Sequence, residues 1–394
     1  MTEGQSKVRR SGILLLGVLF VALALYLPSL KHPFIWDDEG QIVENDVLRD
    51  PHGLPRLLTA STFDVGGGEL TGVFYRPLVS LINYANFRFW DLNPAGYRLL
   101  QILLHLLNVL LVYRLVRTVL DVSKETTSKT LPFFASLLYA LHPVNVESVI
   151  YIGAIGEVLY TLLGLAGLLV LSQHLRRPSG QDIPATALVC FCLLVFASIL
   201  AKESGVVFFL AGGMFLFLFA RNAKRWVLYT VTCCMVTLIY LWLRLGVAGV
   251  PFAAKYPSAI SQASLTERLL TLPYIVAHYI QILVAPIRLT IYDKTVINNA
   301  ASPLFWGPAL MLFAITVFGG LWYRRTKSRA FLFFALFFLV SLVPVLNIYG
   351  LDMTTADRWL YLPAIGFWGA ILVMLYSITQ GKRRLRALLV SGLL

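Results

Sequence analysis

Uncharged apolar runs recur along this chain, and most are about as long as a helix must be to cross a bilayer. The first of them, residues 11–30, contains no charged side chain. A helix rises about 1.5 Å per residue, so roughly 20 apolar residues span the hydrocarbon core. Because 58% of the 394 residues are hydrophobic, only 13% are charged and the mean hydropathy is +0.74, a soluble multidomain protein is excluded. The sequence predicts an all-α, polytopic integral membrane protein.

The apolar runs predict about 10–11 transmembrane helices within a single transmembrane domain, residues 1–394. The run at 11–30 follows basic residues, as in a signal peptide. It is too long for the apolar part of one and lacks a cleavage pattern, so we interpret it as an uncleaved span. The expected spans are residues 11–30, 96–120, 131–148, 149–173, 185–201, 204–220, 226–246, 302–323, 330–349 and 359–379, with a further span that begins near 387 and occupies residues 387–394.

Basic side chains gather in alternate loops, which places the N-terminus and those loops in the cytoplasm. Residues 269–286 are apolar enough to be a span, but counting them would put the basic cluster at 324–329 outside. We therefore expect a re-entrant or interfacial helix there, within an outer loop at 247–301. The longest outer loop, residues 31–95, is expected to carry short helices that lie along the membrane surface.

Fifteen of the twenty acidic side chains fall on the outer side of this topology. Three of them, Asp37, Asp38 and Glu39, follow the first span closely, where a carboxylate cluster is costly unless it faces water or a partner. The net charge of +13 would suit a nucleic-acid partner, but the placement of the basic residues in alternate loops rejects that interpretation. We expect the polar chemistry on the outer face, where short junctions between spans hold side chains firmly.

Polar residues near the ends of the spans supply further candidates. Arg76, in the first outer loop, is either an anion binder or a cation that snorkels to the interface. Four polar residues recur at helical spacing on one face of the span at 96–120: Tyr97, Gln101, His105 and Asn108. That face should meet other helices or a wet cavity, and for His105 and Asn108 we expect interhelical hydrogen bonds.

The outer junctions between later spans also carry charge. His142 and Glu147 lie at one helix-to-helix corner, and Glu157 follows inside the next span, where an acid needs a partner or a water path. Lys202 and Glu203 form another corner, either as an ion pair that caps two helices or with Lys202 free to meet a phosphate. Arg358 lies where the span at 359–379 begins, so its guanidinium could reach an anionic group in the membrane. Two other candidates lie beside it: Asp357 and Tyr361.

Six short segments occur in a fixed order: WDDEG (36–40), YRPL (75–78), NPAGYRLLQILLHLLN (93–108), LHPVNVESV (141–149), AKES (201–204) and ADRWLYLPAIGF (356–367). Together they resemble the membrane half of the O-mannosyltransferases that carry transmembrane and tetratricopeptide-repeat regions, which belong to the polytopic GT-C class of glycosyltransferases. The resemblance covers essentially the whole chain. It implies that a sugar, with a mannose-like hexose favoured, moves from a polyprenyl-phosphate donor among the membrane lipids to a hydroxyl of a protein or glycolipid acceptor.

The resemblance also implies roles for single residues. Related enzymes carry an acid pair in the first outer loop, which makes Asp37 the first choice and Asp38 the second for the base that takes the proton of the attacking hydroxyl. The growing charge of the leaving phosphate calls for fixed cations, and the candidates are Arg76, Lys202 and Arg358. Direct displacement would invert the anomeric centre. The substrate-binding or supporting candidates are Glu39, Tyr97, Gln101, His142, Glu147, Glu157, Glu203, Asp357 and Tyr361.

The chain departs from this family in two places. No tetratricopeptide repeats follow within the 394 residues, so acceptor selection by such repeats is not assumed. The family usually places a basic residue shortly before the acid at Glu157, whereas residues 153–156 contain none. No cofactor is required by the expected reaction, and a divalent cation held by Asp38, Glu147 and Glu203 is a less favoured alternative.

Other functions stay open at this stage. An oligosaccharyltransferase or a glycan ligase would use a lipid-linked glycan with the same outer-face chemistry. A lipid flippase or transporter should show inverted repeats or charges on both faces, whereas the acids here are one-sided. A non-catalytic membrane subunit is a third alternative. We expect a bacterial inner-membrane protein with a cytoplasmic N-terminus and a periplasmic site, or, as the eukaryotic equivalent, a protein of the endoplasmic reticulum membrane with a lumenal site.

Overall fold

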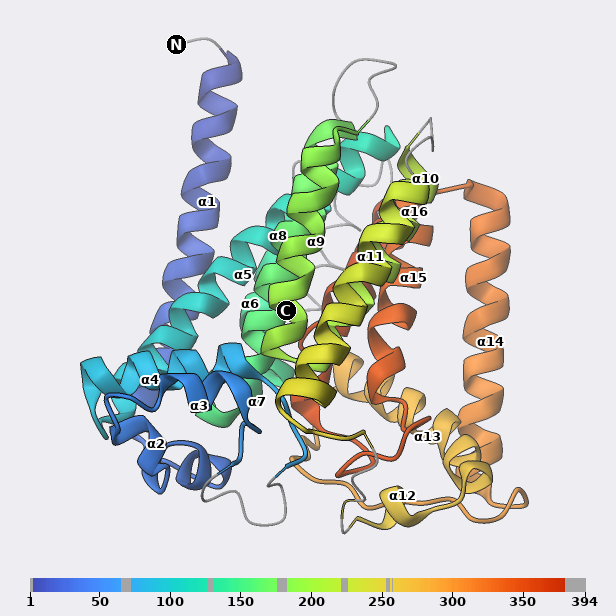
Figure 1. Ribbon diagram of the computed structural model, residues 1–394. Coiled ribbons are helices and arrows are strands. Elements are labelled where there is room, and N and C mark those ends of the chain that lie inside the picture. Colours follow the sequence, from blue (N-terminus) through green and yellow to red (C-terminus); the bar gives the residue numbers. More distant parts are fainter. Residues whose placement is uncertain are drawn as a thin grey trace.

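A computed structural model describes residues 3–64, 72–125, 130–175, 183–220, 226–252, 256 and 258–379. Within these ranges the chain consists of helices and connecting segments and contains no β-strand (Figure 1). The predicted all-α, polytopic membrane fold is thereby confirmed. The expected span at 387–394 lies outside the described residues.

The long helices form one bundle, and its two ends differ. The N-terminus of α1 lies at one end, whereas the short helices that precede α5 and the pair α12 and α13 lie at the other, which we call the loop-rich end (Figure 1). The helices are α1 (Glu3–Tyr26), α2 (Asp46–Arg49), α3 (Leu54–Thr59), α4 (Pro77–Trp90), α5 (Pro94–Ser123), α6 (Leu131–Leu141), α7 (Val146–Ile150), α8 (Ile155–Leu175), α9 (Ala185–Ala201), α10 (Val207–Phe219), α11 (Trp226–Leu241), α12 (Ala259–Gln262), α13 (Leu265–Val284), α14 (Pro303–Thr326), α15 (Arg329–Leu342) and α16 (Pro363–Ile378).

Apolar helices occur at all ten of the complete spans expected from the sequence, but they are not equally long. Five pass a length and hydropathy requirement for crossing a membrane: Gly12–Lys31, Pro94–Ser123, Ile152–Gln173, Trp226–Val247 and Pro303–Thr326. A bent pair, Leu131–Leu141 with Pro143–Ile150, makes a sixth if it is counted as one span, and four apolar helices are shorter: Ala185–Ala201, Glu203–Phe219, Arg329–Val345 and Pro363–Ile378. Seventeen helical residues extend about 26 Å, at the short end of what a span needs, so among the described residues five or six of the ten expected spans meet the requirement for length and hydropathy and the others are shorter apolar helices.

The bend between α6 and α7 has a local cause. Pro143 has no N–H to donate and its ring disfavours helical geometry at the preceding residue. His142 is accordingly extended, with φ −65° and ψ 130°, and its Nδ1 accepts a hydrogen bond from the backbone N–H of Val144. The two helical pieces meet at 52°, so the segment expected as one span at 131–148 is a broken helix.

The polar face predicted for α5 points into the bundle, as expected. His105 and Asn108 are fully buried. A ring nitrogen of His105 lies 2.8 Å from the Tyr361 hydroxyl, and Asn108 donates to the same hydroxyl and to the Val158 carbonyl. These bonds tie α5 to α8 and to the segment before α16, so the predicted interhelical hydrogen bonds are confirmed.

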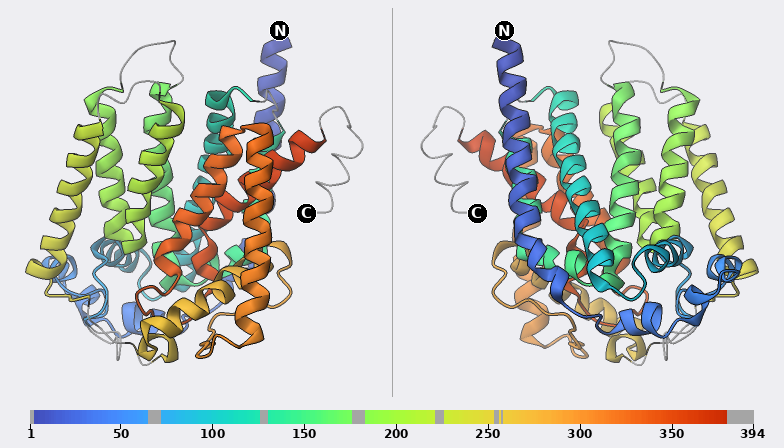
Figure 2. Two further views of the ribbon diagram at one scale, coloured as in Figure 1. Left: turned by 90° about the vertical axis from the view of Figure 1, so that its right-hand side faces the viewer. Right: turned by 90° about the vertical axis from the view of Figure 1, so that its left-hand side faces the viewer.

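The two long helices at the edges of the bundle have little cover. α1 and α14 stand at opposite edges, and no residue of α14 is buried (Figure 1). α13, the segment expected to be re-entrant or interfacial, crosses the loop-rich end at a steep angle to the long helices (Figure 2). It is absent from the described helices that pass the membrane-spanning requirement. The loop-rich end is therefore where irregular backbone and polar side chains concentrate.

Candidate functional site

A cavity of about 240 Å³ opens at the loop-rich end of the bundle. Residues from the first loop, the start of α8, the α9–α10 corner, the end of α11 and the segment before α16 line it, so five separated parts of the chain meet there. Its charged lining residues, four acids and four cations, are Asp37, Glu157, Glu203, Asp352, Arg76, Lys202, Arg244 and Arg358.

Asp37 and Asp38 lie on different sides of the cavity wall. Asp37 lines the cavity, whereas Asp38 is fully buried behind it. One oxygen of Asp38 accepts the Gly153 N–H at 2.7 Å and the other accepts the Ile35 N–H at 3.1 Å. Asp38 therefore fastens the first loop to the start of α8, and Asp37 is left facing the space.

The backbone turn that presents Asp37 is unusual. Trp36 has a φ of 50°, a left-handed conformation that costs free energy for a residue with a side chain. Its ring packs edge-on against Tyr151 with centroids 5.8 Å apart, and the Asp37 N–H donates to the Tyr151 hydroxyl at 3.2 Å. Burial, reinforced by the nearby acids Asp37 and Asp38, raises the pKa of Tyr151, which keeps its phenol protonated beside Asp37.

Two buried residues of α5 support this wall from behind. Arg98 is 1% exposed and donates to the carbonyls of His32, Pro33 and Ile150, which fixes the chain just ahead of Asp37. Gln101 donates to the Ser148 carbonyl at 2.6 Å and the Tyr151 carbonyl at 2.8 Å. Gln101, expected to bind substrate or support the site, is thus a supporting residue that holds the backbone at Tyr151.

Burial also changes the acidity of Asp38. The pKa of its carboxyl is raised to about 6, chiefly by burial, although the two backbone N–H donors and Arg98 favour the charged form. Asp357 behaves similarly: its pKa is raised to about 7 by burial, while it accepts the Thr290 N–H at 2.8 Å. Neither carboxyl lines the cavity.

Lys202 and Arg358 both line the cavity and are both paired with acids. Lys202 forms an ion pair with Glu157 of α8, not with its neighbour Glu203. The second oxygen of Glu157 is buried and has no hydrogen-bond partner among the described residues. Arg358 pairs with Glu147, whose other oxygen accepts the Arg358 backbone N–H at 3.0 Å.

Residues 153–156 contain no basic residue, but a cation from another part of the chain lies beside Glu157. Lys202, from the α9–α10 corner, brings its ammonium to Glu157. Gly156 allows this close approach, because a Cβ added there would lie 3.2 Å from the Ala201 carbonyl oxygen and 3.9 Å from the Cβ of Lys202. A cation therefore reaches Glu157 from another helix corner and not from residues 153–156.

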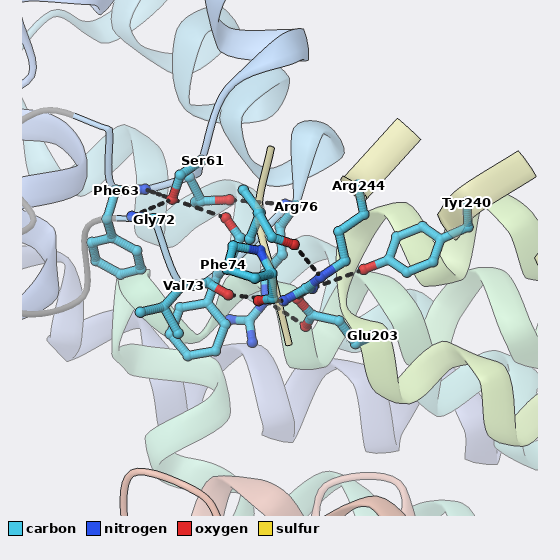
Figure 3. A network of polar contacts seen from close by, with 12 residues as sticks. Ser61, Phe63, Gly72, Val73, Phe74, Arg76, Glu203, Tyr240 and Arg244 are labelled. Carbon is cyan, nitrogen blue, oxygen red and sulfur yellow. Dashed lines mark hydrogen bonds and ion pairs between the residues drawn. The ribbon is translucent and has the colours of Figure 1, made fainter. Parts of the chain in front are cut away.

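Glu203 stands between two arginines (Figure 3). One of its oxygens accepts from Nε of Arg76 at 2.9 Å and the other from Nη1 of Arg244 at 2.9 Å. The Arg76 guanidinium also lies over the Phe74 ring, 4.1 Å from its centroid. Arg244 was not among the residues predicted from the sequence, although a charged residue close to the end of the apolar run at 226–246 was an available signal.

Four of the remaining candidates take up structural positions away from the cavity. Glu39 is exposed at the surface. The Tyr97 hydroxyl donates to the Asp91 carbonyl, and a ring nitrogen of His142 lies 3.1 Å from the Leu283 carbonyl of α13. Tyr361 belongs to the buried network of α5 described above. Tyr97, His142 and Tyr361 thus support the framework of the loop-rich end, whereas Glu39 does not line the cavity.

The proposed cation ligands Asp38, Glu147 and Glu203 each have another partner: backbone N–H groups, Arg358, and the two arginines, respectively. Over the described residues there is no group of three or more His, Cys, Asp or Glu side chains arranged to hold a metal ion. The structure therefore does not bring these three acids together as one site.

Fold and site together define a polytopic helical membrane protein with a charged cavity at one end. No protein-family model matches the chain. It is 27% identical over 378 residues to protein O-mannosyl-transferase F38B6.6 of Caenorhabditis elegans, covering 92% of this chain and 51% of that protein. It is 25% identical over 392 residues to human protein O-mannosyl-transferase TMTC3, covering 89% and 41%. The resemblance to this group of transmembrane O-mannosyltransferases is confirmed, and the chain spans about half the length of these curated relatives.

A solved structure shares the fold. The archaeal oligosaccharyltransferase AglB from Archaeoglobus fulgidus, in complex with an inhibitory peptide and a dolichol-phosphate, superposes with a TM-score of 0.50 and 15% sequence identity. The match covers 97% of this chain and 52% of AglB. At this identity the likeness concerns the arrangement of the helices alone.

Proposed function

We propose that this chain is a glycosyltransferase domain that transfers a sugar, a mannose-like hexose, from a polyprenyl-phosphate donor to a hydroxyl of a protein or glycolipid acceptor. The observation that carries the proposal is the placement of Asp37 in one cavity wall with Arg76, Lys202 and Arg358 around the same space. An acid and several cations are what hydroxyl activation and phosphate departure require.

In the proposed reaction Asp37 takes the proton of the acceptor hydroxyl as its oxygen attacks the anomeric carbon. The bond between that carbon and the phosphate oxygen breaks, and the polyprenyl phosphate leaves with its electron pair. Attack opposite the leaving group inverts the anomeric centre. Arg76, Lys202 and Arg358 stabilise the phosphate charge, and a cavity at the end of the membrane helices lets the polyprenyl tail stay in lipid.

The dimensions of the cavity favour a single sugar. Pockets for drug-sized ligands are about 300–1,000 Å³, and this cavity of about 240 Å³ lies below that range. A hexose with its phosphate fits a space of this size, whereas most of an oligosaccharide would have to lie outside it. Glu157 also lines the cavity, and its second oxygen is buried without a hydrogen-bond partner among the described residues.

We propose that the cavity opens on the non-cytoplasmic side, because the basic loops predict a cytoplasmic N-terminus and α1 begins at the end opposite the cavity (Figure 1). A bacterial inner membrane with a periplasmic site is our preferred location. The reaction as proposed needs no cofactor, because the chain supplies the base and the cations itself.

The test is sugar transfer by the purified chain, using polyprenyl-phosphate mannose and a serine- or threonine-containing peptide. Asp37→Asn should lower turnover by about 10²–10⁴-fold, because the amide cannot take the proton. Glu44→Gln is the matched control, since Glu44 is an exposed acid of the same loop that does not line the cavity. Full turnover in Asp37→Asn would overturn the assignment of the base. Lipid translocation without transfer by the wild type would favour a flippase.

A further inference from the structure

Arg244 is the most completely bonded cation at the cavity. It lies in a π-helical turn, Trp242–Val247, that continues α11, and it is 4% exposed. A buried guanidinium must have its five N–H donors satisfied, so the identity of its partners shows what the residue is for.

All five donors of Arg244 are used within the protein. Nε donates to the Val250 carbonyl at 3.2 Å, and Nη1 donates to Glu203 at 2.9 Å and to the Tyr240 hydroxyl at 3.1 Å. Nη2 donates to the Val73 carbonyl at 2.9 Å and to the Pro251 carbonyl at 3.4 Å. Arg244 therefore has no donor left for a ligand, although its side chain reaches the cavity wall.

Arg76 shows the opposite pattern. Its Nε donates to Glu203, but none of its four terminal N–H donors has a hydrogen-bond partner among the described residues. The carbon of the guanidinium lies 4.1 Å from the centroid of the Phe74 ring, and this contact together with Glu203 restricts where the free donors point. An arginine with one edge anchored and the other free is arranged to bind a phosphate with two parallel hydrogen bonds.

Arg244 and Arg76 are connected in two ways. Each of them donates a hydrogen bond to a different oxygen of Glu203. Arg244 also donates to the Val73 carbonyl, three residues before Arg76 in the same segment (Figure 3). Without Arg244, the freed oxygen of Glu203 would turn to a terminal N–H of Arg76. The carboxylate would then occupy the donors that a phosphate needs.

We propose that Arg244 is a positioning residue that keeps the terminal donors of Arg76 available to the phosphate of the lipid donor. Arg244 holds one oxygen of Glu203 and the backbone at Val73, and Arg76 makes the contact with the phosphate. This inference rests on the proposed function for the identity of the ligand, but the ligand can be tested without sugar transfer.

The experiment is a double-mutant cycle that measures binding of polyprenyl phosphate to the purified chain, together with KM and kcat for polyprenyl-phosphate mannose. Arg244→Gln should weaken polyprenyl-phosphate binding by about tenfold and raise KM by a similar factor, with kcat within about threefold of wild type. Arg76→Gln should weaken binding at least as much. The double variant should bind no more weakly than Arg76→Gln alone, because Arg244 acts through Arg76.

A purely structural role would give different results. Losses that add in the double variant, or an Arg244→Gln protein that binds polyprenyl phosphate like wild type, would overturn the proposal. Arg49→Gln is the matched control: Arg49 also bonds a backbone carbonyl and an acid of the first loop but does not line the cavity.

If Arg244→Gln does not fold, Arg244→Lys is used, which keeps the charge but loses the planar fork and should show the same non-additivity with Arg76→Gln. If the wild type transfers no sugar, the proposed function fails, whereas the binding cycle still decides this inference.

Discussion

Two groups of polar residues, one buried and the other partly buried, lie near the loop-rich end, and they differ in how their hydrogen-bond donors are used. The first is the inward face of α5, where Gln101, His105 and Asn108 bond to carbonyls and to Tyr361. The second is the charged lining of the cavity, where none of the four terminal N–H donors of Arg76 has a hydrogen-bond partner among the described residues. Both groups look alike in the sequence, as polar residues within or beside apolar runs.

The difference teaches that burial alone does not identify a site in a membrane protein. A polar side chain whose donors are spent on other helices stabilises the bundle. A charged side chain that is anchored on one edge and open on the other is costly for folding and useful for binding. If this distinction is correct, substitutions on the α5 face should change the stability of the bundle, whereas substitutions in the cavity lining should change the binding of polyprenyl phosphate.

The largest expected effect on stability comes from splitting a cavity ion pair. Lys202→Met leaves the carboxylate of Glu157, 3% exposed, without its cation and should lower the free energy of unfolding by ~3–5 kcal/mol. The double variant Lys202→Met/Glu157→Met should recover most of that loss but not polyprenyl-phosphate binding. Denaturation in detergent measures the first quantity. A double variant as unstable as the single one would show that the pair stabilises the bundle, as the α5 face does.

The titration of Asp38 gives a smaller effect with a defined sign. Its pKa is about 6 in the folded chain against 3.8 for the ordinary group, so the folded state binds the proton more tightly. The stability due to this group is full below pH 4 and is lost as the pH rises through 6, in total ~3 kcal/mol. The wild type should therefore lose stability relative to Asp38→Asn between pH 4 and 7. A gain over that interval would mean that the N–H bonds from Ile35 and Gly153 outweigh burial.

The smallest effect is expected on the α5 face. Asn108→Ala removes hydrogen bonds to Val158 and Tyr361 and should cost about 1 kcal/mol, the usual value between membrane helices. Polyprenyl-phosphate affinity should not change, because Asn108 does not line the cavity. Thermal melting and lipid binding on the same sample check both statements. A tenfold loss of affinity with little loss of stability would abolish the distinction between the two groups.

The fold was largely predictable, because the runs that became helices are long and their apolar character leaves few alternatives to a helix in lipid. Helix length was less predictable: the run at 131–148 is interrupted at Pro143, and α10 is preceded by a 3₁₀ turn at Glu203–Val206. Four of the residues predicted for the site, Asp37, Arg76, Lys202 and Arg358, line one cavity, but their roles stay predictions. Arg244 was missed because a single arginine at the end of an apolar run also suits a snorkelling cation.

The sequence by itself determined the membrane class, the segregation of the acids and the residue types that meet at the cavity, because these follow from hydropathy and charge along the chain. Only the tertiary structure decided which partner each charge takes. Asp37 and Asp38 are neighbours in sequence, yet one faces the cavity and the other is bonded to Gly153, 115 residues away. Lys202 likewise pairs with Glu157 and leaves Glu203 to two arginines. Such choices depend on which helix ends meet in space, and short-range sequence patterns do not contain that information.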